Sequence, residues 1–326
     1  LNGNNFIAVD AVLTATINGL NAVYQNELSL KFTLVDRRLY TDPATDPFIP
    51  DNQGGAGRTV QAGTVINSIF GASRYDIGHV VHRSESGDGW SSGGLAQLNS
   101  VCNDFVFAGG QIAKASAWSG SFNTNGFSWI SLFAHELGHQ FGAQHTFNGS
   151  GSNCDDAISE TTAYEIGSGT TIMSYNGICS ADQNISSSGA SDNYFHVNSL
   201  MQMMNHIVGN GDCAVKEASG NNIPEVTINP CGANIVIPRS TPFYLDAEST
   251  DADGDNLTYC WEQFDEDGPG VPTQGNIGIN AAVNPIGPLF RSFPPSEESF
   301  RYFPAKNTVL NGNTSDPFDV LPALAR

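Results

Sequence analysis

The chain has 326 residues, enough for two domains of ordinary size. Its 33 acidic side chains against 13 lysines and arginines give a formal net charge of -20, which disfavours nucleic acid as a partner and indicates a soluble surface. No apolar run of about 18 residues is present, so the sequence predicts no membrane span. No basic start precedes an apolar core, so we expect that signal and pro segments are absent from this chain.

The first predicted element is a helix, because apolar residues recur at helical spacing from residue 9 to residue 24. Residues 28–35 alternate between apolar and polar side chains, which predicts a strand with one buried face. Residues 40–62 are rich in Pro, Asp, Gly and Asn and predict a loop. A helical patch at residues 65–70 then leads to a second apolar strand at residues 75–81.

Residues 93–115 carry short strand and loop signals, and a helix follows with Ser128 as its predicted N-cap. A further helix at residues 194–207 is expected to close the domain. The histidines outside the motif described next lack metal-ligand spacing, so we assign them structural roles: His79, His82, His196 and His206.

The helix after Ser128 contains the pattern H-E-x-x-H-x-x-G-x-x-H. His135 and His139 are four residues apart and lie on one helix face, so both can bind one Zn²⁺ at about 2.0–2.1 Å. Glu136 can act as the general base toward a water at that metal. Gly142 can end the helix in the left-handed conformation, after which His145 supplies a third ligand. Three protein ligands leave one tetrahedral position open, as in catalytic zinc sites.

Downstream, Met173 and Tyr175 lie in the stretch G-T-T-I-M-S-Y. The long zinc motif followed by a methionine turn resembles the metzincin clan of zinc proteases. The resemblance implies that Met173 forms an apolar floor beneath the metal and that Tyr175 hydrogen-bonds the reacting carbonyl oxygen. It also implies an α+β fold, with an α/β upper subdomain that holds a twisted sheet and the zinc helix, over an irregular lower subdomain. An edge strand within residues 93–115 would hold extended substrate.

Two families of the clan share features with the chain. His-Thr-Phe at residues 145–147 resembles the pappalysins, whereas residues 164–169 and the N-terminal pattern are more similar to bacterial reprolysin-like (adamalysin-related) proteases. Adamalysins usually have Asp after the third histidine, where this chain has Thr146. In such proteins the loop at about residues 176–195 forms a wall of the specificity pocket.

The six cysteines show no C-x-x-C spacing and predict three disulfides, which form in an oxidising compartment. The protein is therefore expected to be secreted. Sequence alone leaves the connectivity open. By position, the expected pairs are Cys102 with Cys213, Cys154 with Cys179, and Cys231 with Cys260.

A composition break divides the chain into a catalytic domain at residues 1–216, a linker at 217–225 and a C-terminal domain at 226–326. Short β-rich runs between Pro, Gly and Asp turns predict an immunoglobulin-like β-sandwich there. This domain resembles the PKD or fibronectin-like modules of secreted bacterial hydrolases. We expect the native polypeptide to continue beyond Arg326, so that the sandwich is truncated in this chain.

A calcium loop is the alternative to a polar turn in that domain. Its acidic ligands would be Asp251, Asp253, Asp255 and Glu262. Asn256 occupies the position where the loop requires glycine, which favours the polar turn. The resemblance also leaves room for structural Ca²⁺ near acidic residues of the lower subdomain, namely Asp155, Asp156 and Glu160.

The sequence thus predicts a secreted, monomeric zinc endopeptidase that hydrolyses extended protein substrates. The alternatives are a catalytically silent adhesin that binds through its β-sandwich, and a zinc amidase acting on small molecules. The complete set of three histidines, base and methionine turn argues against both. Cleavage preference, natural substrate, exact metzincin family, latency and the role of the C-terminal module stay open.

Overall fold

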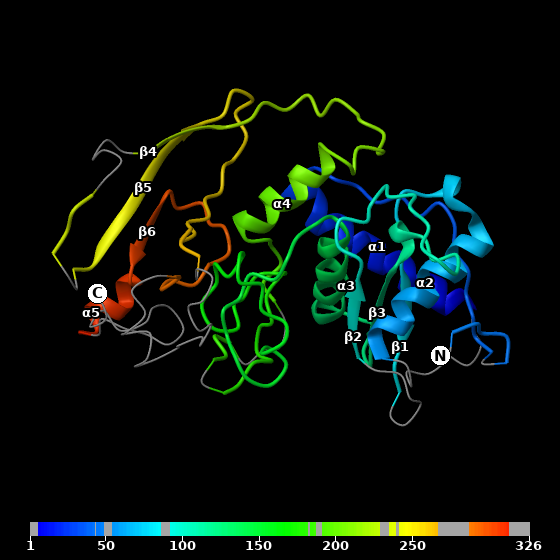
Figure 1. Cartoon of the computed structure of the whole chain (residues 1–326). Coiled ribbons are helices and arrows are strands. Elements are labelled where there is room, and N and C mark those ends of the chain that lie inside the picture. The colour runs from blue at the N-terminus through cyan, green and yellow to red at the C-terminus, as the bar shows by residue number, and fades with distance from the viewer. Residues whose placement is uncertain are drawn as a thin grey trace. The chain divides into compact units, whose positions relative to one another are not determined.

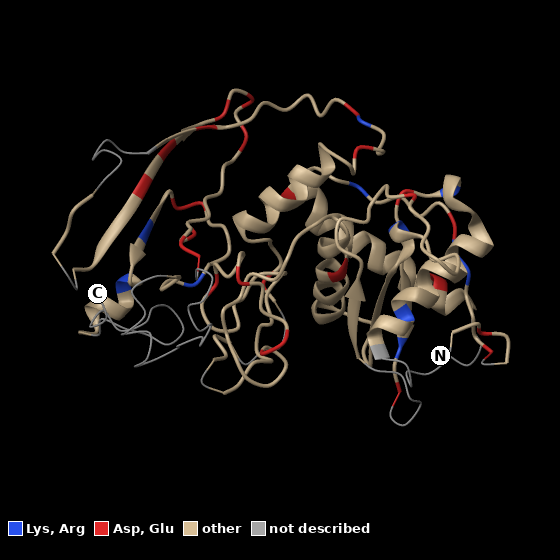
Figure 2. Cartoon of the chain, in the orientation of Figure 1, with Lys and Arg blue, Asp and Glu red and all other residues tan. Residues whose placement is uncertain are grey.

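The computed structural model describes residues 6–42, 44–48, 54–85, 92–181, 183–186, 191–228, 235–238, 241–266 and 287–312. Its contacts divide the chain into two compact units. The first unit contains Leu1–Gln144 and Asn193–Val215, and the second contains His145–Asp192 and Lys216–Arg326. Figure 1 labels the helices and strands of both units, which are described one unit at a time below. Acidic residues are spread over the helices, strands and loops of both units (Figure 2).

A small mixed sheet organises the first unit. It contains β1 (Val80–Arg83), β2 (Gly93–Ala96) and β3 (Ala117–Ser121) in the order β1-β3-β2. The central strand β3 pairs with β1 in parallel and with β2 in antiparallel orientation. Strand β2 therefore forms an edge of the described sheet.

The described part of the first unit also contains four α-helices. They are α1 (Phe6–Leu28), α2 (Gly54–Phe70), α3 (Phe127–Gln140) and α4 (Val197–Ile207), and short 3-10 helices occupy Ala72–Arg74 and Ala113–Ala115. Helix α3 contacts β2, β3 and α1, while α2 contacts β2 and β3. The mixed α/β structure expected from the sequence is present in this unit.

Helix α1 packs against α3 through buried aromatic and polar contacts. Tyr24 is fully buried and donates its hydroxyl to the backbone oxygen of Ala134, at 2.8 Å. Trp129 of α3 donates its indole N–H to the hydroxyl of Thr16, at 2.9 Å. The ring of Tyr24 also contacts the rings of Phe32, Phe141 and Phe195. This cluster fixes the helix that carries the predicted zinc ligands.

The predicted strand at residues 28–35 is wrong. Leu28 is the last residue of α1, and the following residues adopt no regular structure. The side-chain amide of Asn21 accepts from the backbone N–H of Phe32 and donates to its C=O, at 2.7 and 3.0 Å. An amide from the preceding helix thus replaces a neighbouring strand as the hydrogen-bond partner, while Phe32 packs on Tyr24.

The loop predicted at residues 40–62 is too long, since α2 begins at Gly54. Trp118 of β3 packs over the first turn of this helix: a Cβ added at Gly55 would lie 3.2 Å from the indole ring. The indole N–H of Trp118 also donates to the backbone oxygen of Gly55, at 3.0 Å. Tertiary packing outweighs the low helix propensity of glycine here.

Two further boundaries differ from the expectation. Gly126, with φ of 77°, is the N-cap of α3 and makes no side-chain cap hydrogen bond. The prediction of Ser128 as N-cap is therefore wrong, because the helix already begins at Phe127. Strand β1 begins at Val80, near the end of the strand predicted at residues 75–81.

Helix α1 also corrects the expectation about membrane segments. Among the described residues, this one helix is long and apolar enough to cross a membrane by length and composition, with a mean hydropathy of 1.5 over its best window. The sequence test missed it because scattered polar residues interrupt the apolar run. Core helices and signal sequences meet the same criterion, and Leu20, Val23 and Tyr24 of α1 are buried.

The second unit begins with irregular structure. Within its residues 145–192 the described part contains no helix or strand, only an isolated bridge between Phe147 and Glu165. A disulfide joins Cys154 to Cys179, and both cysteines pack with Phe147 in a small core. The irregular structure expected from the sequence after the zinc helix is present.

The C-terminal part of the second unit forms a three-stranded antiparallel sheet. Its strands are β4 (Glu225–Ile228), β5 (Phe243–Thr250) and β6 (Phe300–Phe303) in the order β4-β5-β6, and α5 (Lys306–Leu310) follows. The described residues contain one sheet in this region, so the β-sandwich stays a prediction.

The C-terminal part packs against the irregular half of the same unit. Tyr164 stacks on Phe264 with ring centroids 4.4 Å apart. Arg291 pairs with Asp192 at 3.4 Å. These contacts come from residues on both sides of the predicted linker.

The structure also confirms the expected disulfide between Cys102 and Cys213, in the first unit. The third expected disulfide joins Cys231 to Cys260, and Cys231 lies outside the described residues.

Candidate metal centre

Helix α3 presents the first two motif histidines and then stops sharply. Gly142 has φ of 104°, and a Cβ at this position would lie 2.4 Å from the side-chain oxygen of Asn99. Both the backbone conformation and the lack of space therefore require glycine. The N–H of Gly142 donates to the C=O of His139, and the N–H of Ala143 donates to the C=O of Gly138, each at 2.9 Å. This turn directs the chain toward His145, as the sequence predicted.

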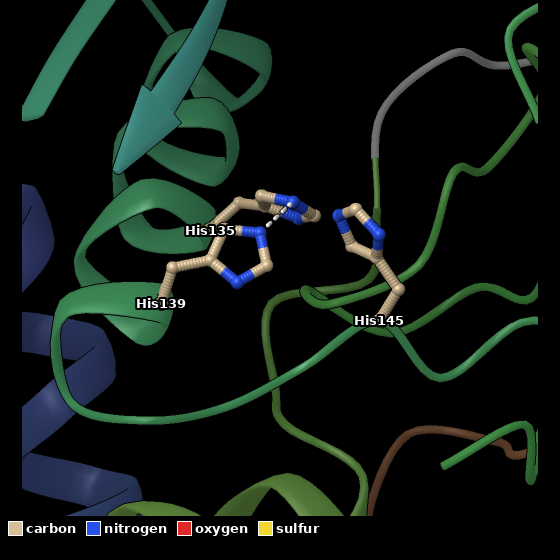
Figure 3. A group of neighbouring side chains, drawn as sticks. All are labelled: His135, His139 and His145. Atoms are coloured by element: carbon tan, nitrogen blue, oxygen red, sulfur yellow. Dashed lines mark hydrogen bonds between the residues drawn. The ribbon is translucent and has the colours of Figure 1, made fainter. Parts of the chain in front are cut away.

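The three histidines converge. One ring nitrogen from each of His135, His139 and His145 lies within 4.8 Å of the others. Figure 3 shows the rings of His135 and His139 extending from the helix toward the ring of His145. The Nε2 atoms of His135 and His139 are 3.1 Å apart. Tetrahedral zinc with Zn–N bonds of about 2.05 Å requires a nitrogen spacing of about 3.3 Å, so the spacing of these two nitrogens fits the metal.

Backbone carbonyls orient two of these rings. The Nδ1 atom of His139 lies 2.7 Å from the backbone oxygen of Ala143, and the Nδ1 atom of His145 lies 2.5 Å from that of Ala157. Because a carbonyl can only accept, each Nδ1 carries the proton and each Nε2 keeps its lone pair for a metal. Burial lowers the pKa of His145 to about 4, against the opposing effect of its bond to Ala157. The ring is therefore in its neutral, metal-binding form at pH 7.

Glu136 is buried beside the edge strand. Its side chain is 4% exposed and packs so closely on β2 that a Cβ added at Gly94 would lie 2.4 Å from its Cδ. Burial raises the pKa of Glu136 to about 8. Its Oε2 atom makes no hydrogen bond within the described part of the chain. The charge of a nearby divalent cation would favour the ionised carboxylate, the form that can accept a proton.

The methionine turn lies along the segment that carries the third histidine. Met173 is fully buried, and its backbone oxygen accepts from the N–H of Thr146 at 3.2 Å. The ring of Tyr175 stacks on Phe147 with centroids 4.7 Å apart and meets the ring of His145 edge-on at 4.6 Å. These contacts bring Tyr175 to the third ligand. The roles expected for Met173 and Tyr175 stay predictions.

Two residues of this region carry no motif and were missed in the sequence. Gly94 permits the close approach of Glu136, and a glycine inside a strand can signal such an approach. Glu165 is 1% exposed and accepts four hydrogen bonds from residues around the third histidine and the methionine turn. No local pattern indicates this role, because the donors lie 5, 6 and 19 positions away in the chain.

The remaining histidines lie in structural positions. The ring of His79 is held between Gln140 and Ser119, with both nitrogen contacts at 2.9 Å. Burial lowers the pKa of His79 to about 4, and its bond to Gln140 opposes this shift. His196 accepts from the backbone at the start of α4 as its N-cap. His82 stacks on Trp118, and the Nε2 atom of His206 lies 3.2 Å from the backbone oxygen of Val101.

The three aspartates after β5 form a turn. Their carboxylate oxygens lie within 4.8 Å of one another. Asp251 accepts from the backbone N–H groups of Asp253 and Asp255, at 2.9 and 3.0 Å. Glu262, the twelfth residue of the calcium-loop pattern, instead accepts from the hydroxyl of Ser292 at 2.5 Å. The contacts are those of the polar turn that the sequence favoured.

Three convergent histidines and a buried glutamate beside an edge strand define a zinc metalloprotease. The model of the metallopeptidase family M12B, reprolysin-like, matches residues 4–206, which is more than half of the chain. The chain therefore belongs to this family. No curated protein matches the sequence.

Proposed function

We propose that the protein is a secreted endopeptidase that cleaves extended protein substrates with a zinc-dependent mechanism. The observation that carries this proposal is the convergence of a ring nitrogen of His145 with those of His135 and His139, which lie on the helix that also holds Glu136. The family membership supports peptide-bond hydrolysis as the reaction.

The residues divide the chemistry among them. His135, His139 and His145 would hold zinc and leave one position open. When bound, zinc supplies Lewis-acid chemistry, since it lowers the pKa of a coordinated water toward ~7 and polarises the scissile carbonyl. Glu136 accepts the proton of the attacking water at its Oε2 atom and transfers it to the leaving amine. Tyr175 donates its phenolic O–H to the developing oxyanion, and Met173 forms the floor of the site.

The edge strand β2 suits an extended substrate. Its backbone pairs on one side with β3 and lies next to Glu136 on α3. A peptide added as a further strand would present its carbonyl groups near this base. We propose that the loop at residues 176–195 contributes to the specificity pocket that receives the side chain after the cleaved bond.

The proposal also covers the compartment, the domain boundaries and the oligomeric state. Two disulfides suit an oxidising, extracellular compartment. We assign residues 1–216 to catalysis, 217–225 to a linker and 226–326 to an immunoglobulin-like β-sandwich, and we expect a monomer. Strands β4, β5 and β6 support the β-rich character of the last segment.

Hydrolysis of a mixed peptide library, with cut sites determined by mass spectrometry, tests the proposal. The zinc-loaded protein should cut, and a zinc chelator should abolish the cuts. Glu136→Ala should lower kcat by about 10³-fold while zinc content is kept. Glu217→Ala, which removes an exposed glutamate from the predicted linker, should leave kcat unchanged. A folded, zinc-loaded protein without cuts would refute the proposal and favour a binding protein.

A further inference from the structure

Glu165 is a buried carboxylate whose environment is built from neutral donors. Its side chain is 1% exposed, and burial of a carboxylate is strongly unfavourable unless hydrogen bonds replace its water. Its Oε1 atom accepts from the backbone N–H groups of Thr170 and Thr171, at 2.9 and 3.1 Å. Its Oε2 atom accepts from the hydroxyls of Thr146 and Thr171, each at 2.5 Å. Both oxygens are therefore satisfied without a basic partner.

The donors come from the two segments that meet at the metal centre. Thr146 directly follows His145, and Thr171 lies two residues before Met173. The backbones of these segments are joined as well. Glu165 donates its N–H to the backbone oxygen of Thr146 at 2.7 Å, and Thr146 donates to that of Met173 at 3.2 Å. Through these hydrogen bonds the carboxylate connects the segment of His145 to the segment of Met173.

The turn before Met173 wraps closely around this carboxylate. Gly169 has φ of 63°, and a Cβ there would lie 3.1 Å from the Cδ of Glu165 and 2.6 Å from the Cβ of Ser174. An apolar side chain at position 165 could fill the space, but it would leave the N–H groups of Thr170 and Thr171 without their acceptor. The geometry therefore requires an acceptor oxygen for these two N–H groups.

We propose that Glu165 is a positioning residue of the metal centre, which holds His145 and the loop of Met173 in the arrangement that binds zinc. The inference rests on the proposed zinc site, although its main test does not require catalysis. A carboxylate that stabilises only the fold of the second unit would affect unfolding without changing metal affinity.

Zinc affinity of the whole chain, measured by competition with a chromophoric chelator, tests this role. Glu165→Ala should weaken zinc binding roughly tenfold, at the lower end of the range for residues that orient ligands from behind. Glu165→Gln should stay within about threefold of the native affinity. Its carbonyl oxygen can accept from the two N–H groups, and its amide can donate to the two threonine hydroxyls, which also accept.

A second pair of variants keeps the test decisive if Glu165→Ala does not fold. Thr146→Val removes one hydroxyl donor at nearly constant shape and should weaken zinc binding about threefold or more, whereas Thr146→Ser keeps the hydroxyl and should restore it. The absorption spectrum of the Co²⁺-substituted protein should change in Thr146→Val and not in Thr146→Ser. At saturating zinc, kcat should fall while KM for a peptide stays within twofold or so.

Phe303→Leu is the matched control, because Phe303 is 5% exposed in β6 and its ring packs on Phe243 and Phe290, which are not among the described hydrogen-bond partners of Glu165. It should lower stability without changing zinc affinity or the Co²⁺ spectrum. Native zinc affinity and spectrum in Glu165→Ala, or in Thr146→Val, would overturn the proposal. A native protein that binds zinc but cleaves no peptide would refute the endopeptidase function and leave the role of Glu165 to be decided by affinity alone.

Discussion

The substitution Gly94→Ala places one methyl group against Glu136, the proposed general base. The added Cβ would lie 2.4 Å from the Cδ, Cγ and Oε1 atoms of Glu136, whereas non-bonded carbons prefer about 3.5–4.0 Å. The carboxylate must therefore move by about 1 Å, since Gly94 belongs to a paired strand and Glu136 to a packed helix. A displacement of about 1 Å at a reacting group can cost ~10²-fold in rate, which corresponds to about 2.7 kcal/mol.

The assay is steady-state hydrolysis of a peptide that the native enzyme cuts, with zinc content measured on the same samples. Gly94→Ala should lower kcat about 100-fold and retain zinc, because the three atoms nearest to the added methyl all belong to Glu136 and none to a histidine. Gly93→Ala is the matched control, since a Cβ there meets nothing within 4 Å. Because residue 93 has φ of 132°, this variant should be less stable by about 1–3 kcal/mol, but the added methyl does not move Glu136.

A double-mutant cycle separates the steric effect from general damage to the strand. In a Glu136→Ala background the truncated side chain leaves room for the methyl, so Gly94→Ala should cost almost nothing further in residual activity. Equal losses in the native and Glu136→Ala backgrounds would refute the steric argument. Equal losses in Gly93→Ala and Gly94→Ala would do the same.

Three further measurements follow from the structure. His79 should contribute a decrease of roughly 3 kcal/mol to the free energy of unfolding as pH falls from about 6.5 to about 4, because the folded state keeps this ring neutral while the unfolded state protonates it. Urea titrations of His79→Gln should show a pH profile that is flatter by this amount than that of the native protein, and an unchanged profile would contradict the argument. Replacing Cys154 and Cys179 by serine should cost about 3 kcal/mol for a loop of 25 residues, measured as a lower denaturant midpoint, and an unchanged midpoint would show that the crosslink does not stabilise the fold. Tyr175→Phe should lower kcat roughly tenfold with KM and zinc content unchanged, while native kcat would restrict Tyr175 to packing on Phe147.

The metal centre was largely predictable because its determinants are local. Helical spacing alone places His135 and His139 on one face. The need for a left-handed residue at Gly142 then determines where the chain turns toward His145. Each step involves residues within one or two turns of one another, so sequence spacing carries the information.

The features that the sequence did not reveal depend on distant partners. Asn21 occupies the hydrogen-bonding groups of Phe32, so an alternating pattern forms no strand. Trp118 stabilises a helix that starts at glycines, 63 positions earlier in the chain. In both cases the intrinsic preference of the local sequence favours the predicted structure, but a side chain from another element makes the stronger interaction.

Contacts between distant residues also determine the surroundings of the methionine turn, where Thr170 links three segments. Thr170 donates its N–H to Glu165, which holds the segment of the third ligand, and its hydroxyl lies 3.5 Å from the backbone oxygen of Ser292 in the C-terminal part. Arg291, next to Ser292, pairs with Asp192, whose N–H donates to the backbone oxygen of Thr170. A break in composition shows where the chain leaves one region, but it does not show which regions pack together. Because these contacts share Thr170, the C-terminal part supports the loop that carries the methionine turn.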